Sequence, residues 1–380
     1  NKLSLTDLIY KTKRELNKFH FVIHLTSKLI KKSTTRTFSS LLTPNSSSVV
    51  SASATKSFIK LEKKQIDTEW KKIDQLNLKS LEINSINLNA FDYFGHIKSL
   101  NLSSNNLKRV HDKQFQTIRE LIDLDLSDNK ISALRRKCSF YYLSSLEILN
   151  LDSNRIESLN ENDFERLTNL RQLNLAKNLI KEINQEALLQ LTNLKSLNLT
   201  GNRIEVVNNY MFQYLINLEE LNLSNNLVID VKMKAFANLK KLVVLDLSFN
   251  QIDYLNENQF EELNSLIKLQ IASNQLISIN SQHFNGLENL KSLDLSKNKI
   301  ESVPENILIN MRSLNYLNLK NNLKLTASSD LSEDTLIRNR LVFHENSIKL
   351  TTNKRSKLNK LSNTKNSSTP ITKDSFKLDL

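Results

Sequence analysis

Leucines recur along the middle of this chain at a nearly constant distance. The phrase "LKSLNLTGNRI" begins at Leu194, and close variants of it begin every 24 residues, with one interval of 25. The starting positions are residues 73, 97, 121, 146, 170, 194, 218, 242, 266, 290 and 314. This spacing fits neither the 3.6-residue period of a helix nor the two-residue period of a long strand. It indicates repeats of one structural design, which stack into a solenoid.

Each repeat predicts a short strand followed by a turn. In the unit at 194, Leu197 and Leu199 share one face because side chains alternate along a strand, and the polar Asn198 between them faces solvent. One unit cannot bury its own apolar side chains, but stacked units can, at roughly 1.5–3 kcal/mol per large side chain. The pattern therefore predicts eleven parallel strands. At about 4.8 Å between strands, they form a concave sheet roughly 48 Å long.

Two further columns complete the unit, one of asparagine and one mostly of phenylalanine. An asparagine follows the strand, and its amide can both donate and accept hydrogen bonds at the turn. The first unit carries Leu81 instead, which suits a terminal repeat. The asparagine column is Asn105, Asn129, Asn154, Asn178, Asn202, Asn226, Asn250, Asn274, Asn298 and Asn322. The second column predicts a packed convex spine, with Phe91, Phe115, Phe140, Phe164, Leu188, Phe212, Phe236, Phe260, Phe284 and Leu308.

The segments around this second column read as short helical turns. Asn256 is predicted to cap one of them at its N-terminus. The whole pattern, L-x-x-L-x-L-x-x-N-x-I-x-x-L-x-x-x-x-F-x-x-L, resembles the leucine-rich repeat of the 24-residue typical class. The resemblance covers residues 73–323. It implies an α/β solenoid, a right-handed horseshoe with a parallel concave sheet and short helical or irregular convex segments. The resemblance also implies a function. Proteins of this class include the ectodomains of Toll-like receptors, Slit-like guidance proteins and matrix or adhesion proteins, so the chain is expected to bind other macromolecules without catalysis.

The sequence outside the repeats divides into four segments. Residues 1–55 form a basic Ser/Thr/Lys-rich arm, either flexible or a targeting segment, whose composition resembles an organelle transit peptide. Residues 56–72, with Trp70, are predicted to cap the first repeat, ahead of ten full units and a truncated one in 73–323. Residues 324–344 read as a closing segment and residues 345–380 as a disordered polar tail. No run reaches the roughly 18 apolar residues of a membrane span.

The net charge of +13 lies on the flanks. Residues 1–72 hold 15 Lys and Arg against 5 Asp and Glu, and residues 324–380 hold 11 against 6. The repeats hold 27 against 29. A basic stripe that could follow a nucleic-acid backbone is therefore not expected along the solenoid. The expected partner is a protein on the concave face.

Few residues suggest chemistry of their own. The single cysteine, Cys138, cannot form an intrachain disulfide, unlike the cysteine-clustered caps of the extracellular proteins that the pattern resembles. Its basic neighbours favour a reactive thiolate, and an inert loop cysteine is the alternative. Four carboxylates on adjacent units are expected to form a solvated acidic patch, and a calcium site is the less favoured alternative: Asp123, Asp125, Asp128 and Asp152. No catalytic residue, metal or cofactor is expected, because nucleophile-elbow, phosphate-loop and zinc motifs are missing from the sequence.

The concave face offers candidate partner-binding residues. Its central column is polar throughout, so the apolar, aromatic or charged exceptions beside it stand out: Ile148, Val244, Phe249, Lys268 and Tyr316. Val244 and Phe249 are predicted to lie on one strand and Lys268 on the next, which would make them the centre of the site. The alternative is that single exposed apolar residues are ordinary. Five sequons are candidate glycosylation sites, and three of them coincide with the repeat phrase: Asn45, Asn101, Asn198, Asn222 and Asn366.

Three classes of function remain open. An extracellular or cell-surface recognition module follows from the family resemblance. An intracellular scaffold or regulatory adaptor is the alternative, favoured by the missing cysteine caps and by the Val303-Pro304 variant in the unit at 290. A hydrolase or ligase with a repeat platform would need a catalytic domain beyond these ends.

Overall fold

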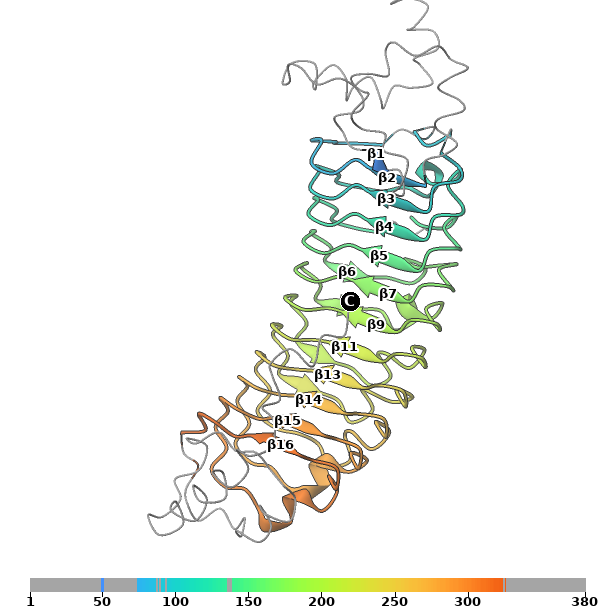
Figure 1. Cartoon of the computed structure of the whole chain (residues 1–380). Coiled ribbons are helices and arrows are strands. Elements are labelled where there is room, and N and C mark those ends of the chain that lie inside the picture. The colour runs from blue at the N-terminus through green and yellow to red at the C-terminus, as the bar shows by residue number, and fades with distance from the viewer. Residues whose placement is uncertain are drawn as a thin grey trace, which may run out of the picture.

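The computed structural model describes residues 49–50, 74–86, 88, 90–92, 94–134, 139–323 and 325. They form a curved stack of coils whose strands line up along one side (Figure 1). Each repeat contributes one three-residue strand: β2 (Gln75–Asn77), β3 (Ser99–Asn101), β4 (Asp123–Asp125), β5 (Ile148–Asn150), β7 (Gln172–Asn174), β9 (Ser196–Asn198), β11 (Glu220–Asn222), β13 (Val244–Asp246), β14 (Lys268–Gln270), β15 (Ser292–Asp294) and β16 (Tyr316–Asn318). Neighbouring strands pair in parallel, and Leu197 lies beside Leu221 in one sheet. The predicted eleven-stranded solenoid is confirmed.

The sheet also has a twelfth strand. β1 (Val49–Val50) pairs in parallel with β2. The sequence predicts part of the basic arm here, and these two residues instead extend the sheet. Their pairing satisfies backbone groups that the edge of β2 would otherwise expose. The rest of the arm, the predicted cap with Trp70, the tail and all of the closing segment except residue 325 lie outside the described residues.

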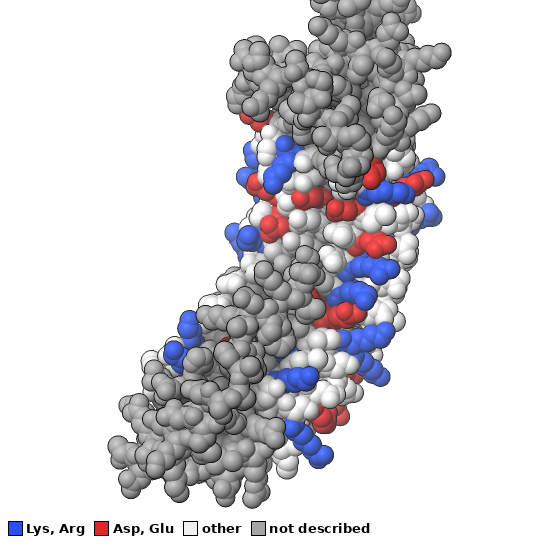
Figure 2. All heavy atoms as spheres, in the orientation of Figure 1, with Lys and Arg blue, Asp and Glu red and all other residues white. Residues whose placement is uncertain are grey.

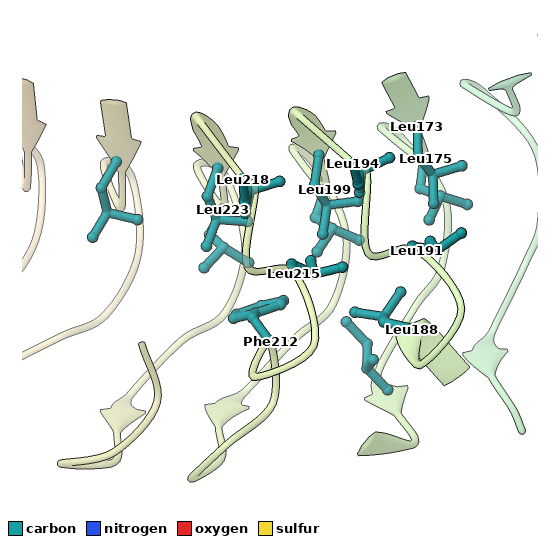
Figure 3. Packing of buried hydrophobic residues seen from close by; sticks show 14 of the residues in the cluster. Leu173, Leu175, Leu188, Leu191, Leu194, Leu199, Phe212, Leu215, Leu218 and Leu223 are labelled. Atoms are coloured by element: carbon teal, nitrogen blue, oxygen red, sulfur yellow. The ribbon is translucent and has the colours of Figure 1, made fainter. Parts of the chain in front are cut away.

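The core fills the space between the strands and the convex segments. The middle residue of each repeat strand is a leucine that points inward, and Leu197 is 1% exposed. Leucines of the strands face Phe212, Leu188 and Leu215 of the convex side (Figure 3). Side chains from successive repeats interleave in this way, so one apolar cluster runs through the whole stack.

The convex column is a packed spine, as predicted. Its residues are at most 2% exposed, apart from Leu308 at 6%. Rings of consecutive repeats stack almost parallel, with centroids 6.2 Å apart for Phe91 and Phe115 and 6.0 Å for Phe236 and Phe260. Such pairs add about 0.5–1.5 kcal/mol beyond their burial. The phenylalanines therefore hold neighbouring coils together and form no ligand pocket.

The convex segments contain little helix. The 3₁₀ helices are η4 (Asp112–Gln114), η5 (Gln185–Leu188), η6 (Ser281–Phe284) and η7 (Glu305–Leu308), with two-residue strands β6 (Ser158–Leu159), β8 (Glu182–Ile183), β10 (Val206–Val207) and β12 (Asp230–Val231). Asn184 and Asn280 cap η5 and η6. The predicted cap at Asn256 is wrong, because residues 257–262 form a series of turns and no helix. The Asn256 side chain instead donates its Nδ2 to the Val231 carbonyl at 2.9 Å. Among the described helices, none has the length and hydropathy to cross a bilayer.

The asparagine column bonds each repeat to the one before it. Asn202 Nδ2 donates to the carbonyls of Leu175 and Leu199, both at 2.9 Å, and its Oδ1 accepts the Ile180 N–H at 3.0 Å. The other nine asparagines make the equivalent bonds. The first unit can carry Leu81 because Asn105 of the next unit accepts the Leu81 N–H at 3.0 Å.

A second set of asparagines joins the repeats on the side where the chain returns to the sheet. Each donates its Nδ2 to a carbonyl of the preceding repeat at 2.8–2.9 Å, from Asn169 to Ser144, Asn193 to Thr168, Asn217 to Thr192 and Asn289 to Asn264. These inter-repeat hydrogen bonds were not predicted from the sequence. Their signal is the asparagine one position before the first leucine of these units, as in "TNL".

One buried carboxyl in the convex segments has an unusual environment. This carboxyl belongs to Asp163. In the unit at 242 the same position holds Gln259, whose Oε1 accepts the Asn256 N–H and whose Nε2 donates to the Val231 carbonyl, both at 2.9 Å. Asp163 Oδ2 accepts the Asn160 N–H at 2.6 Å, but Oδ1 lacks a hydrogen-bond partner. The side chain is 0% exposed, and this burial raises the pKa of Asp163 to about 6.

Replacement of Asn202 by alanine should cost about 1–3 kcal/mol, because backbone groups of two repeats lose their partner inside the core. Asn198→Ala is the matched comparison within the same unit. Sequence alone predicts that it is nearly neutral, but Asn198 Oδ1 accepts the Thr200 N–H at 3.1 Å, so a loss of about 0.5–1 kcal/mol is expected. Urea unfolding midpoints measure both losses. Equal losses would contradict the assigned register.

Replacement of Asp163 by asparagine should stabilise the fold in a pH-dependent way. The pKa in the folded chain, about 6, lies above the ordinary value of 3.8, so folding favours the protonated carboxyl. The stability from this group is full below about pH 3.8 and is lost as the pH rises through 6. The variant should match the parent near pH 4 and exceed it by about 3 kcal/mol above pH 7. Urea unfolding at both pH values tests this, with the exposed Asp253→Asn as control; a pH-independent difference would refute it.

Candidate functional site

The concave face carries a hollow of about 380 Å³. Its floor is made of β5, β7, β9, β11, β13 and β14. The apolar side chains of Ile148 and Val244 project from the first and the fifth of these strands, and its charged lining residues are Glu220 and Asp246. The remaining lining is made of amide and hydroxyl side chains and of the strand leucines. The hollow is therefore mildly acidic, with apolar side chains on β5 and β13.

Parallel pairing places these side chains in rows. Ile148, Gln172, Ser196, Glu220 and Val244 are aligned across five neighbouring strands. With about 4.8 Å between strands, Ile148 and Val244 lie about 19 Å apart along the row. Glu220 stands one strand before Val244, and Ser196 Oγ lies 3.4 Å from Glu220 Oε2.

The structure places Val244 and Lys268 on paired strands, as predicted, and separates the other residues that the sequence grouped. Ile148 and Val244 line one hollow. Lys268 lies beside Val244 on β14 but is not part of the lining, and Tyr316 lies two strands further on β16. The sequence predicts Phe249 on the strand of Val244, but β13 ends at Asp246 and the chain turns away at Phe249. That part of the prediction is wrong.

Phe249 occupies a backbone conformation that bulky residues avoid. Its φ is 56°, and the same position of the other repeats, also at positive φ, holds Ser80, Ser104, Asp128, Ser153, Lys177, Gly201, Asn225, Ser273, Lys297 and Asn321. The left-handed conformation costs a residue with a Cβ atom about 1–2 kcal/mol. Phe249 is nevertheless 52% exposed, and Lys297 Nζ lies 5.9 Å from the centre of its ring. A strained, exposed aromatic side chain of this kind is a candidate contact residue.

The polar column between the strand leucines has a structural role that the sequence analysis missed. Asn198 Oδ1 accepts the N–H of Thr200, two residues later. The same turn forms at Asn77, Asn101, Asp125, Asn150, Asn174, Asn222, Asp246, Asp294 and Asn318. Asparagine and aspartate are suited to it, because their short side chains reach their own backbone. This column fixes the polar floor of the hollow before any partner arrives.

The four aspartates considered as calcium ligands do not gather around one point. Asp123 and Asp125 lie on β4, next to the hollow, whereas Asp128 lies in the following turn at a φ of 51°. Burial raises the pKa of Asp123 and the Asp125 charge adds to this, while a hydrogen bond from Ser99 acts in the opposite direction. Within the described ranges, no three His, Cys, Asp or Glu side chains gather as metal ligands.

The sequons differ in their surroundings. Asn198 and Asn222 line the hollow, and Asn101 lies in the same column on β3. A glycan on Asn198 or Asn222 would fill the hollow, so modification there and occupation by a partner exclude each other. Asn45, Asn366 and Cys138 lie outside the described residues.

Similarity to solved structures supports the same fold. Residues of this chain superpose on a structure described as the TLR13–ssRNA13 complex with a TM-score of 0.65, at 25% identity, over 76% of this chain and 45% of that one. A leucine-rich repeat protein of Leptospira interrogans gives 0.58, at 23% identity, over 79% and 84%. The Toll–Spatzle complex of Drosophila gives 0.56, at 21% identity, over 71% and 39%. The chain thus spans less than half of the TLR13 chain.

Sequence comparison identifies the family. The comparison with curated proteins found no match. The family model for the leucine rich repeat matches residues 95–140, 136–180, 168–228, 216–276 and 264–323. These matches cover more than half of the chain and coincide with the repeats of the solenoid. The chain therefore belongs to the leucine-rich repeat family.

Proposed function

We propose that this chain is a non-catalytic recognition module that binds a protein partner in the concave hollow. The observation that carries the proposal is the hollow itself, in which Ile148 and Val244 stand at two points of a polar, mildly acidic floor. Covering these apolar side chains removes them from water, which is the main favourable contribution to most protein–protein association. The expectation that the chain is not an enzyme rests on the family, whose modules typically bind partners without catalysis.

We further propose that the module acts outside the cell or at its surface, in recognition, adhesion or reception. The support is the 24-residue typical repeat together with the similarity to the TLR13 structure. In that setting the sequons would make the protein a glycoprotein. An intracellular scaffold or regulatory adaptor is the alternative, because the one cysteine rules out an intrachain disulfide and Val303-Pro304 departs from the typical repeat.

A protein partner is favoured over a nucleic acid, although the TLR13 structure contains a single-stranded RNA. Glu220 and Asp246 would face the phosphates of a nucleic acid laid in the hollow. On the face shown in Figure 2, Lys and Arg side chains of the described repeats are interspersed with Asp and Glu. The charge of the solenoid thus offers little attraction to a phosphodiester backbone.

A photo-crosslinking amino acid placed at Gln172, which lines the hollow and is exposed, should capture a polypeptide in cells that express the full chain. The same group at Leu189, 41% exposed on the convex side after η5, should capture little. Val244→Asp should abolish the adduct at Gln172, because it places a charge where an apolar contact is expected. Mass spectrometry and ribonuclease treatment identify the adduct. A ribonuclease-sensitive adduct, or one that survives Val244→Asp, would contradict the proposal.

Phe249→Asn should stabilise the fold by about 0.5–1 kcal/mol and still weaken partner binding. Asparagine tolerates a positive φ, and the gain is reduced by the lost contact with Lys297. A partner contact would explain why a strained aromatic residue stands there. Thermal unfolding and binding of the crosslinked partner measure the two effects, with Ser273→Asn, at a φ of 55°, as control. Unchanged binding would leave Phe249 outside the site.

A further inference from the structure

We infer that the occupant of the hollow is an extended peptide segment laid across the strands, with two apolar residues six positions apart and a basic residue two positions from one of them. This inference rests on the proposed function and specifies the partner. It follows from the size of the hollow, the spacing of its apolar lining residues and the position of its charges.

The size of the hollow limits the shape of the occupant. Its volume of about 380 Å³ lies near the lower end of ligand pockets, which hold roughly 300–1,000 Å³. An α-helix with its side chains is about 10–12 Å wide. A hollow of this volume, lined by residues of six neighbouring strands, accepts a few side chains, and we infer that they come from one extended chain.

The two apolar lining residues set the spacing of the peptide. Ile148 and Val244 stand in one row, four strand spacings apart, which is about 19 Å at the backbone. An extended chain advances about 3.3 Å per residue, and residues separated by an even number share a face. Six residues span about 20 Å and four span about 13 Å, so only the separation of six matches.

The charges place a cation near one end. Glu220 lies one strand from Val244 in the same row, and Asp246 lies two residues along the strand from Val244. The other lining residues are uncharged. Lys268 lies beside Val244 on the other side, on β14. A peptide residue two positions from the one at Val244, in the direction of Ile148, lies about 7 Å from it, beside Glu220 and away from Lys268. Lysine or arginine at that position would face both carboxylates, and the carboxylates would disfavour an acidic residue there.

The floor is already ordered for such a ligand. Asn174, Asn198 and Asn222 are each held by a backbone N–H that donates to the side-chain Oδ1. Side chains that are fixed before binding lose little freedom when a partner arrives. The peptide backbone would lie over these amides, and its other side chains would point to solvent.

Selection of phage-displayed random dodecapeptides on the immobilised full chain tests the inference. The enriched peptides should share two apolar residues six apart and a lysine or arginine two positions from one of them. Synthetic copies, measured by fluorescence anisotropy, should bind Glu220→Lys at least about tenfold more weakly than the parent. Glu205→Lys makes the same charge change at an exposed position outside the hollow and should leave affinity unchanged. Glu220→Gln, with a smaller expected loss, replaces the lysine variant if that variant does not fold.

The outcomes separate this inference from the proposed function. If no peptide is enriched, the extended-peptide occupant is overturned. If enriched peptides lack the basic residue or bind Glu220→Lys as tightly as the parent, while Ile148→Asp abolishes binding, the hollow binds peptides but the inferred chemistry is wrong. If Ile148→Asp and Val244→Asp both bind as the parent does, the hollow is not the site and the proposed function fails with the inference.

Discussion

The asparagine that leaves each strand bonds to backbone groups of its own repeat and of the repeat before it, and the rest of the structure depends on this bond set. Asn202, for example, joins Leu175, Ile180 and Leu199 within the core. A buried turn without such a partner would leave several backbone groups unpaired. Because each asparagine lies 24 or 25 residues from the next, the same bonds fix the rise and direction of every coil. The strands then pair in register and the phenylalanines stack as a consequence.

The inward and the concave side chains of the solenoid therefore have different roles. The inward leucines and phenylalanines provide the burial, and the asparagines satisfy the backbone at the turns. The concave side chains at the first position of each strand are consequently free to differ from repeat to repeat without loss of the fold, whereas the Asn/Asp column beside them closes the turns. The row that contains Ile148, Glu220 and Val244 uses this freedom, since the equivalent position also accepts Gln172 and Ser196. Variation on a constant scaffold is what a recognition surface requires.

Two positions depart from the local rules of the repeat. Asp163 places a carboxyl where Gln114 and Gln259 offer both an acceptor and a donor, so one of its oxygens is buried without a partner. Phe249 places a bulky side chain at a positive φ. Asp163 is fully buried and its effect is confined to stability. Phe249 is exposed, and so its strain can be offset by contacts with a partner.

The sequence by itself determined the solenoid, because a 24-residue period with an asparagine and an apolar column at constant positions is compatible with one way of stacking. It also predicted which face Leu197 and Ile148 take, since alternation along a strand decides that. The tertiary structure alone decided which exposed residues meet. Ile148 and Val244 are 96 positions apart in the chain and share one hollow through four strand pairings, whereas Phe249, five positions from Val244, turns away. The length of a strand depends on where its turn closes, and that depends on hydrogen bonds to neighbouring repeats that a single repeat does not contain.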